Sequence, residues 1–190
     1  MAKQDNGDKR ERILSAAREA FRRNSYDETR MADIAREAGV APGTVYLYFA
    51  SKEAIVWALA EKYVDQVSAR VRAAMETTDL HAAIAGSVHA AFEQSQEERD
   101  LVRLFKLSNG LGECAEMVPA DRALLDAMTE YLEAGMERGD IRRYPPRALA
   151  TLIRGTVESV SELSLEKDPE ETARNEAALI DILYNTLRPV

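Results

Sequence analysis

The sequence predicts an all-α fold of nine helices, divided into a three-helix N-terminal domain and a larger helical C-terminal domain. Apolar residues recur three and four positions apart along nearly all of the 190-residue chain, and no stretch alternates as a strand would. Capping residues or prolines stand at predicted helix starts, and glycines follow two predicted ends. This length accommodates a small and a larger domain with a proper core. We place the boundary between residues 52 and 53.

The first predicted helix runs from about residue 8 to residue 24. Residues 1–8 are polar and lack periodicity, so we predict a disordered tail there, the alternative being an arm that contacts DNA. Tyr26 is expected to pack in the turn after the helix. The inner face of the helix is formed by Ile13, Leu14, Ala17, Ala20 and Phe21. The basic residues available to such an arm are Lys3, Lys9, Arg10 and Arg12.

Residues 29–53 predict two short helices joined by a tight turn. Thr29 is expected to cap the first helix, whose apolar stripe continues to Ala38. Gly39 follows at once, where a sharp turn favours positive φ. Pro42 suits the first turn of the next helix. The buried stripe of the first helix is Met31, Ile34, Ala35 and Ala38.

The second of these helices is about two turns long and has two different faces. Val45 and Phe49, four residues apart, are expected to point back to the first helix. The other side chains include hydroxyl groups and an apolar tip, which suit phosphates and a thymine methyl group. The exposed set is Thr44, Tyr46, Leu47 and Tyr48.

The string AGVAPGTVYLYFASKEAI, at residues 38–55, resembles the DNA-binding domain of TetR-family transcriptional regulators. The family pattern is A-G-V-S-x-G-T-[LIV]-Y-x-[YH]-F-x-[SN]-K-[ED], and the resemblance covers about the first third of the chain. Ala41 departs from it, because the family usually has Ser there. We therefore expect weaker helix capping and weaker phosphate anchoring at Ala41.

The resemblance implies a DNA-contacting surface and a C-terminal domain for ligand binding and dimerisation. Most of the implied contacts position the DNA backbone, whereas Pro42, Gly43 and Leu47 would lie near base edges. A purely structural role is more plausible for Tyr48 than for Tyr46 or Lys52. The complete predicted DNA-binding set is Thr29, Arg30, Ala41, Pro42, Gly43, Thr44, Tyr46, Leu47, Tyr48 and Lys52.

The C-terminal domain is predicted to consist of helices only. Ser51 caps a helix to about residue 75, with Lys52 in the first turn, where an anion is favoured. Asp79 caps the next, and a further helix carries Leu101, Leu104, Phe105 and Ser108. Residues 109–119 break the pattern. The remaining helices are expected over about residues 120–138, 146–167 and 169–187.

The last two helices are apolar on more than one side, which is unusual for a monomer surface. We expect them to pair with a second copy in a four-helix interface, as in the family. The predicted dimer interface is Leu149, Leu152, Ile153, Thr156, Val160, Leu179, Ile180, Ile182, Leu183 and Leu187.

A ligand pocket is predicted among the central helices of the C-terminal domain, with Arg103 or Arg154 as anchors for an acid or phosphate. Core packing is the simpler interpretation of each residue taken singly. The string ERGDIRRYPPRALATLIRGTVE faintly resembles acyl-CoA-responsive regulators of fatty-acid degradation. Long-chain acyl-CoA is therefore the candidate effector placed slightly ahead of a hydrophobic drug or another amphipathic ligand. The lining set is Phe92, Arg103, Leu104, Phe105, Met117, Met128, Tyr131, Leu132, Arg154 and Val157.

Other chemistries find little support. His81, His89 and Glu93 share a helix face but offer too few ligands for a closed metal site. Cys114 stands beside carboxylates that disfavour its thiolate, which argues against a redox sensor. We predict no cofactor, no metal and no enzymatic activity.

Charge and hydropathy point to a cytoplasmic DNA-binding protein. The net charge is −8, yet residues 1–52 hold 10 Lys and Arg against 8 Asp and Glu, while the remaining residues hold 15 against 25. Neither a signal peptide nor a membrane span is expected. The predicted partners are double-stranded operator DNA, a small-molecule effector and a second copy of the chain. The rival hypotheses are a ligand-independent DNA organiser and an enzyme or carrier.

Overall fold

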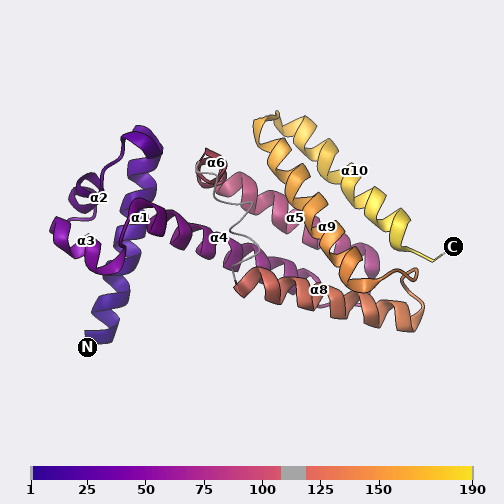
Figure 1. The fold of residues 1–190 in the computed structure, drawn as a ribbon. Helices are drawn as coiled ribbons and strands as arrows, with labels where there is room; N and C mark the ends of the chain where they lie inside the picture. Colours follow the sequence, from indigo (N-terminus) through magenta and orange to yellow (C-terminus); the bar gives the residue numbers. More distant parts are fainter. Residues whose placement is uncertain (1, 108–118, 190) are drawn as a thin grey trace. The chain divides into compact units, whose positions relative to one another are not determined.

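The computed structural model describes residues 2–107 and 119–189, with side chains from residue 7 onward except at 106–107. Within these residues the chain forms nine α-helices and one 3₁₀ turn, with no strand (Figure 1). The predicted all-α fold is therefore confirmed. Ser108, Cys114 and Met117, which entered the sequence predictions, lie outside the described residues.

The helices follow the predicted order along the chain. Their bounds are α1 Ala2–Glu28, α2 Met31–Glu37, α3 Pro42–Tyr48, α4 Lys52–Ala74, α5 Leu80–Glu97, α6 Arg99–Leu107, α8 Pro119–Arg138, α9 Pro146–Leu163 and α10 Pro169–Leu187, with the 3₁₀ turn η2 at Ser164–Glu166.

The chain divides into two compact units. Unit 1 comprises Met1–Lys62 and Asp100–Ala115, and unit 2 comprises Tyr63–Arg99 and Glu116–Val190. A domain boundary after residue 52 stays a prediction, and the division into compact units falls within α4. The reason is that the first turns of α4 pack into unit 1, where Lys62 contacts Glu11 and Ile55 is fully buried.

Unit 1 is built around a small apolar core from α1, α2, α3 and the start of α4. Ile13, Ile34, Val45 and Ile55 are all 0% exposed, so each of the four helices contributes a fully buried side chain. Full burial of such a side chain contributes about 1.5–3 kcal/mol. The predicted inner faces of α1 and α2 are thereby confirmed, except that Met31 is only half-buried.

Helix α1 differs from its prediction at both ends. It starts at Ala2, so residues 2–8 are helical and the predicted disordered tail is wrong for them. Ala2, Lys3 and Gln4 favour helix, and Gly7 alone does not stop it. Near the other end, Ser25 adopts φ 61° and ψ 166°, which breaks the helix before Tyr26.

Unit 2 has its own core, to which α5, α8, α9 and α10 all contribute. Val88 and Phe92 of α5 meet Leu132 of α8, Ala150 of α9 and Leu183 of α10 in one buried cluster. The side chains of Asp79 and Asp168 cap α5 and α10 by accepting hydrogen bonds from Ala82 and Glu171 backbone N–H groups at 2.9 and 2.8 Å. Both caps were predicted, and both are confirmed.

Candidate nucleic-acid interface

The turn between α2 and α3 has a complete Schellman geometry. Gly39 adopts φ 65°, its N–H donates to the Arg36 carbonyl oxygen at 3.2 Å, and the Val40 N–H donates to the Ala35 carbonyl oxygen at 3.0 Å. The predicted positive φ at Gly39 is confirmed. This turn sets the direction in which α3 leaves α2.

Helix α3 presents one buried face and one exposed face. Val45 is fully buried and Phe49, at the C-cap, is 4% exposed, whereas Tyr46 is 56% and Leu47 is 83% exposed. Exposing a large apolar side chain such as Leu47 carries no folding benefit. The exposed face is therefore available to a partner, and its polar and apolar groups match those of a DNA major groove.

The N-terminus of α3 is open. Pro42 occupies its first turn, as predicted, and Ala41 at the N-cap makes no side-chain capping bond. A Cβ atom built on Gly43 would meet no atom within 4 Å, so the approach to this end of the helix is unobstructed. Thr44 and Tyr48 are half-buried beside the exposed pair.

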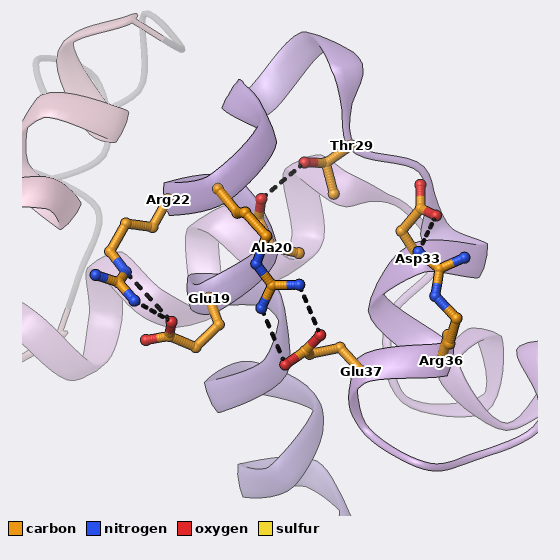
Figure 2. A network of polar contacts seen from close by, with 8 residues as sticks. Glu19, Ala20, Arg22, Thr29, Asp33, Arg36 and Glu37 are labelled. Carbon is orange, nitrogen blue, oxygen red and sulfur yellow. Dashed lines mark hydrogen bonds and ion pairs between the residues drawn. The ribbon is translucent and has the colours of Figure 1, made fainter.

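Thr29 must be removed from the predicted contact surface. Its side chain is 1% exposed, and its hydroxyl donates to the Ser25 carbonyl oxygen at 2.6 Å. The hydroxyl also lies 3.3 Å from the Ala20 carbonyl oxygen, as Figure 2 shows. The predicted capping role is also wrong, because the N-cap of α2 is Arg30. The hydroxyl instead ties Thr29 to the backbone of α1 at Ala20 and at Ser25, where the helix breaks.

Arg30 remains exposed beside α2. Its backbone N–H donates to the Asp33 carboxylate at 3.1 Å, and Asp33 also accepts from Arg36 at 2.9 Å. Figure 2 shows Asp33 and Arg36 together on this helix, and a second pair lies nearby, where Arg23 donates twice to Glu37 at 3.1 and 3.2 Å. These pairs hold α2 in place and leave the Arg30 side chain accessible.

Lys52 does not project into solvent. Its ammonium donates to the Tyr26 carbonyl oxygen at 2.7 Å and lies 4.4 Å from the centroid of the Tyr26 ring. The Tyr26 hydroxyl in turn donates to the Glu53 carboxylate at 2.9 Å. A phosphate contact by Lys52 stays a prediction, and it would require the ammonium to share or exchange its present partners.

Helix α1 supports this surface from behind. The Arg12 side chain donates to the Ala38 carbonyl oxygen at 2.8 Å, which satisfies the C-terminal end of α2. Arg10 lies over the Phe49 ring, 5.3 Å from its centroid. Ser51 accepts from the Ala54 N–H at 3.3 Å, which confirms its predicted cap of α4.

The predicted ligand-pocket residues do not form one set. Arg103, Leu104 and Phe105 belong to unit 1, where Arg103 and Leu104 line a small pocket with Phe21 and Tyr26. The other described members belong to unit 2. Phe92 and Leu132 are core residues there, and Met128, Tyr131 and Val157 pack against the same cluster. Met117 lies outside the described residues.

Arg154 belongs to a polar group that the sequence analysis missed. It donates to Asp121 at 3.1 Å and to Glu158 at 3.3 Å. On neighbouring turns, Ser161 accepts from Ser95 at 3.3 Å, and the Tyr63 hydroxyl lies 3.0 Å from the Ser95 hydroxyl. Ser95 and Ser161 occupy helix positions where the pattern would favour apolar residues, and this was the sequence signal for the polar group.

The predicted dimer-interface residues differ in burial, and the interface itself stays a prediction. Leu149, Leu179, Leu183 and Leu187 are buried in the core of their own unit, because α9 and α10 turn one apolar side inward. Ile153, Val160 and Ile180 are partly buried against that core, and Thr156 is half-buried. Leu152 at 62% exposed and Ile182 at 60% exposed are the predicted members that face outward.

The two histidines have separate partners. His89 lies 2.9 Å from the Glu176 carboxylate, and the His81 ring packs edge-on to Tyr184 at 5.1 Å. Among the described residues, no group of three His, Cys, Asp or Glu side chains is arranged to hold a metal ion. In the same part of the chain no helix is both long and apolar enough to cross a bilayer.

Comparison with known proteins identifies this helix-turn-helix. Residues 13–59 match the family described as bacterial regulatory proteins, tetR family. Residues 13–59 form a DNA-binding domain of the TetR family. This confirms the resemblance found in the string at residues 38–55.

Two sequence relatives are HTH-type transcriptional regulators. YvdT of Bacillus subtilis, an uncharacterised HTH-type transcriptional regulator, is 43% identical over 75 residues, which are 37% of this chain and 38% of YvdT. RutR of Escherichia coli K12, an HTH-type transcriptional regulator, is 32% identical over 126 residues, 66% of this chain and 56% of RutR. The matches therefore cover well under two thirds of either relative.

The whole fold also has solved counterparts. FadR of Bacillus subtilis, solved in complex with stearoyl-CoA, superposes with a TM-score of 0.75 at 23% identity and covers 92% of this chain and 97% of its own. This similarity establishes a shared fold across both units.

Proposed function

We propose that this protein binds double-stranded operator DNA as a homodimer, acts as a repressor and leaves the DNA when an effector binds unit 2. The single observation that carries the proposal is the two-faced helix α3, in which Val45 is fully buried and the adjacent Tyr46 and Leu47 are exposed. The matching family model over residues 13–59 supports the same assignment. The site would lie in the cytoplasm, where operator DNA is found.

Helix α3 would supply the contacts in the major groove. Leu47 can contact a thymine methyl group, and the Tyr46 hydroxyl can donate to a phosphate. Arg, Asn and Gln are absent from α3, so few bidentate hydrogen bonds to bases are available. Discrimination between sites would then rest on methyl contacts and DNA shape.

The outward sides of α9 and α10 would form the dimer. Leu152, Leu163 and Ile182 are each 60% exposed or more, although large aliphatic side chains favour burial. Gly155 lies on α9 with no atom within 4 Å of a built Cβ, which permits close approach of another helix. A two-fold dimer places two α3 helices about 34 Å apart in successive major grooves.

Effector binding would change operator affinity through differential affinity for two conformations. Only a ligand that binds the DNA-incompetent conformation more tightly can shift the population. Because FadR of Bacillus subtilis binds stearoyl-CoA on the same fold, a long-chain acyl-CoA is one effector to test.

Fluorescence anisotropy tests the proposal directly. The purified protein is titrated onto labelled DNA from upstream of its own gene, with and without long-chain acyl-CoA, at fixed salt. We expect salt-sensitive binding to the operator, and weak binding to a scrambled duplex of equal length. Equal affinity for both duplexes would indicate a DNA organiser instead, and no binding to either would refute the proposal.

A further inference from the structure

Unit 1 contains a pocket that shares no residue with the predicted DNA-binding set. Helices α1 and α6 form it, and its volume is about 160 Å³. A cavity of about this size accommodates one benzene molecule. The lining residues are Arg18, Phe21, Arg22, Ser25, Tyr26, Asp100, Leu101, Arg103 and Leu104.

The buried part of the lining is apolar. Phe21 of α1 is 6% exposed, and Leu101 and Leu104 of α6 are 5% and 8% exposed. The half-buried Tyr26 ring lies 5.5 Å from the Phe21 ring, tilted by 47°. Aromatic rings at such separations attract one another, so a further ring placed against this pair would gain a similar contact.

The Tyr26 wall of the pocket is held in place without a ligand. The Tyr26 hydroxyl donates to Glu53 at 2.9 Å, and the Lys52 ammonium lies 4.4 Å from the ring centroid. The adjacent lining residue, Ser25, adopts φ 61° and ψ 166°, which residues with side chains rarely do. Such backbone persists only where its surroundings impose it, and it recurs at ligand-binding sites. The pocket is therefore preformed.

The polar part of the lining is rich in guanidinium groups. It contains three arginines and one carboxylate, Asp100. Arg22 is exposed and donates from Nε and Nη2 to Glu19 at 3.2 and 2.7 Å (Figure 2). These bonds use one edge of a group that has five N–H donors, and an exposed ion pair contributes little to stability. Arg22 can therefore also donate to a bound carboxylate.

We propose that this pocket binds a small aromatic carboxylate, with its ring against Phe21, Tyr26 and Leu104 and its carboxylate on Arg22. Burying the ring would remove apolar surface from water. The carboxylate would accept charge-assisted hydrogen bonds from the planar donor set of a guanidinium group. The pocket belongs to unit 1, so this site is additional to the effector binding proposed for unit 2 and does not depend on it.

Size and charge distinguish this ligand class from others. A ligand of several rings or a long acyl chain exceeds a volume of about 160 Å³. An organic cation would meet the guanidinium groups of Arg18, Arg22 and Arg103, with Asp100 as the one opposing group of the lining. A single ring that carries a negative group matches both properties of the pocket.

Saturation-transfer NMR titrations on the full chain test the site without DNA. The probes are benzoate, benzyl alcohol and benzylammonium, which share one ring and differ in charge at neutral pH. We expect benzoate to bind about fivefold more tightly than either of the others, because a charge-assisted hydrogen bond at a partly exposed site contributes roughly this factor.

A matched pair of arginine variants tests the carboxylate contact. Arg22→Gln should bring the affinity for benzoate to within about twofold of that for benzyl alcohol, since the charged donor is lost. Arg174 of α10 is the control, because its side chain is 62% exposed against 60% for Arg22, and it pairs with Glu170 on its own helix. Arg174→Gln should change benzoate affinity by less than about twofold.

A pocket-filling variant tests the apolar contact. Leu104→Phe adds volume at the lining, so benzoate and benzyl alcohol should both bind at least about fivefold more weakly. Thermal melting of each variant checks folding, and Leu101→Phe replaces Leu104→Phe if that variant is unstable.

Four results would overturn the inference. These are benzylammonium binding as tightly as benzoate, absence of benzoate binding up to about 10 mM, equal losses in Arg22→Gln and Arg174→Gln, and full benzoate affinity in both Arg22→Gln and the pocket-filling variant. The anisotropy assay on operator DNA is independent of these titrations. Retained operator binding would then leave the proposed function intact while the pocket in unit 1 is rejected as a site.

Discussion

The Nζ atom of Lys52 lies 2.7 Å from the carbonyl oxygen of Tyr26 and 4.4 Å from the centroid of the Tyr26 ring. The first turn of α4 is thereby tied to the segment that follows the break in α1 at Ser25. The Tyr26 hydroxyl closes the arrangement by donating to Glu53, the residue after Lys52. Lys52 thus has a structural partner in the DNA-free protein.

The Tyr26 hydroxyl should make stability depend on alkaline pH. Burial, followed by the hydrogen bond to Glu53, raises the pKa of Tyr26 from 10.0 to about 12. Because the folded pKa is the higher one, the contribution is complete below pH 10 and is lost as pH rises toward 12. Chemical denaturation of wild type and Tyr26→Phe across this range should show a steeper decline in the wild-type protein. Parallel declines would contradict the assignment.

Loss of a phosphate contact should lower the affinity for DNA without changing the sequence preference. Tyr46→Phe and Lys52→Ala are each expected to weaken binding to operator and to non-cognate DNA by similar factors, because phosphates carry no sequence information. Lys52→Ala should also reduce the magnitude of the slope of log K against log salt concentration by about one, as expected for the loss of one phosphate contact. Anisotropy at several salt concentrations measures both quantities. A loss confined to the operator would reject the phosphate role.

Gly39 and Gly43 should respond differently to alanine. Gly39→Ala places a Cβ at φ 65° and should lower the free energy of unfolding by about 1–2 kcal/mol. The Cβ atom of Gly43→Ala would meet open space. The free energy of unfolding should therefore stay within about 0.5 kcal/mol of the wild-type value, while DNA binding weakens. Urea denaturation and anisotropy on the same two variants separate folding from recognition. Equal destabilisation by both would show that Gly43 is structural.

Gly135 should be intolerant of any side chain. A Cβ there would lie 2.5 Å from the Ile141 Cδ1 atom, because the Schellman turn at Gly139 returns the chain onto α8. Gly135→Ala should cost about 1–3 kcal/mol of stability through overpacking. In the background of Ile141→Ala the penalty should shrink, and a double-mutant cycle measures that coupling. A coupling energy near zero would place the strain elsewhere.

Exposed and buried leucines on the last helices should separate dimerisation from folding. Leu152→Asp combined with Ile182→Asp should yield a folded monomer, since both side chains face outward. Leu183→Ala should instead lower stability by about 2–5 kcal/mol through a core cavity. Analytical ultracentrifugation and thermal melting distinguish the outcomes. An unchanged sedimentation coefficient in the double variant would remove α9 and α10 from the interface.

The sequence predicted the order of the helices and most of the cap residues, because these depend on local chemistry. Apolar spacing placed Ile34 and Val45 on buried faces, and Gly39 marked a turn that requires positive φ. Asp79 and Asp168 marked helix starts because their carboxylates satisfy N–H groups within the same turn. The DNA-binding motif was equally local, since α2, its turn and α3 form one continuous segment.

Contacts between distant segments were decided only by the tertiary structure. Thr29 and Lys52 have side chains suited to phosphate. The Thr29 hydroxyl is nevertheless buried against Ala20, and the Lys52 ammonium lies over the Tyr26 ring. Leu183 and Ile182 are adjacent in sequence, and only packing determines that the former enters the core and the latter faces outward. The hydrogen-bond partners of a polar side chain and the burial of an apolar one depend on which helices pack together. The residue pattern of a single helix does not specify those neighbours.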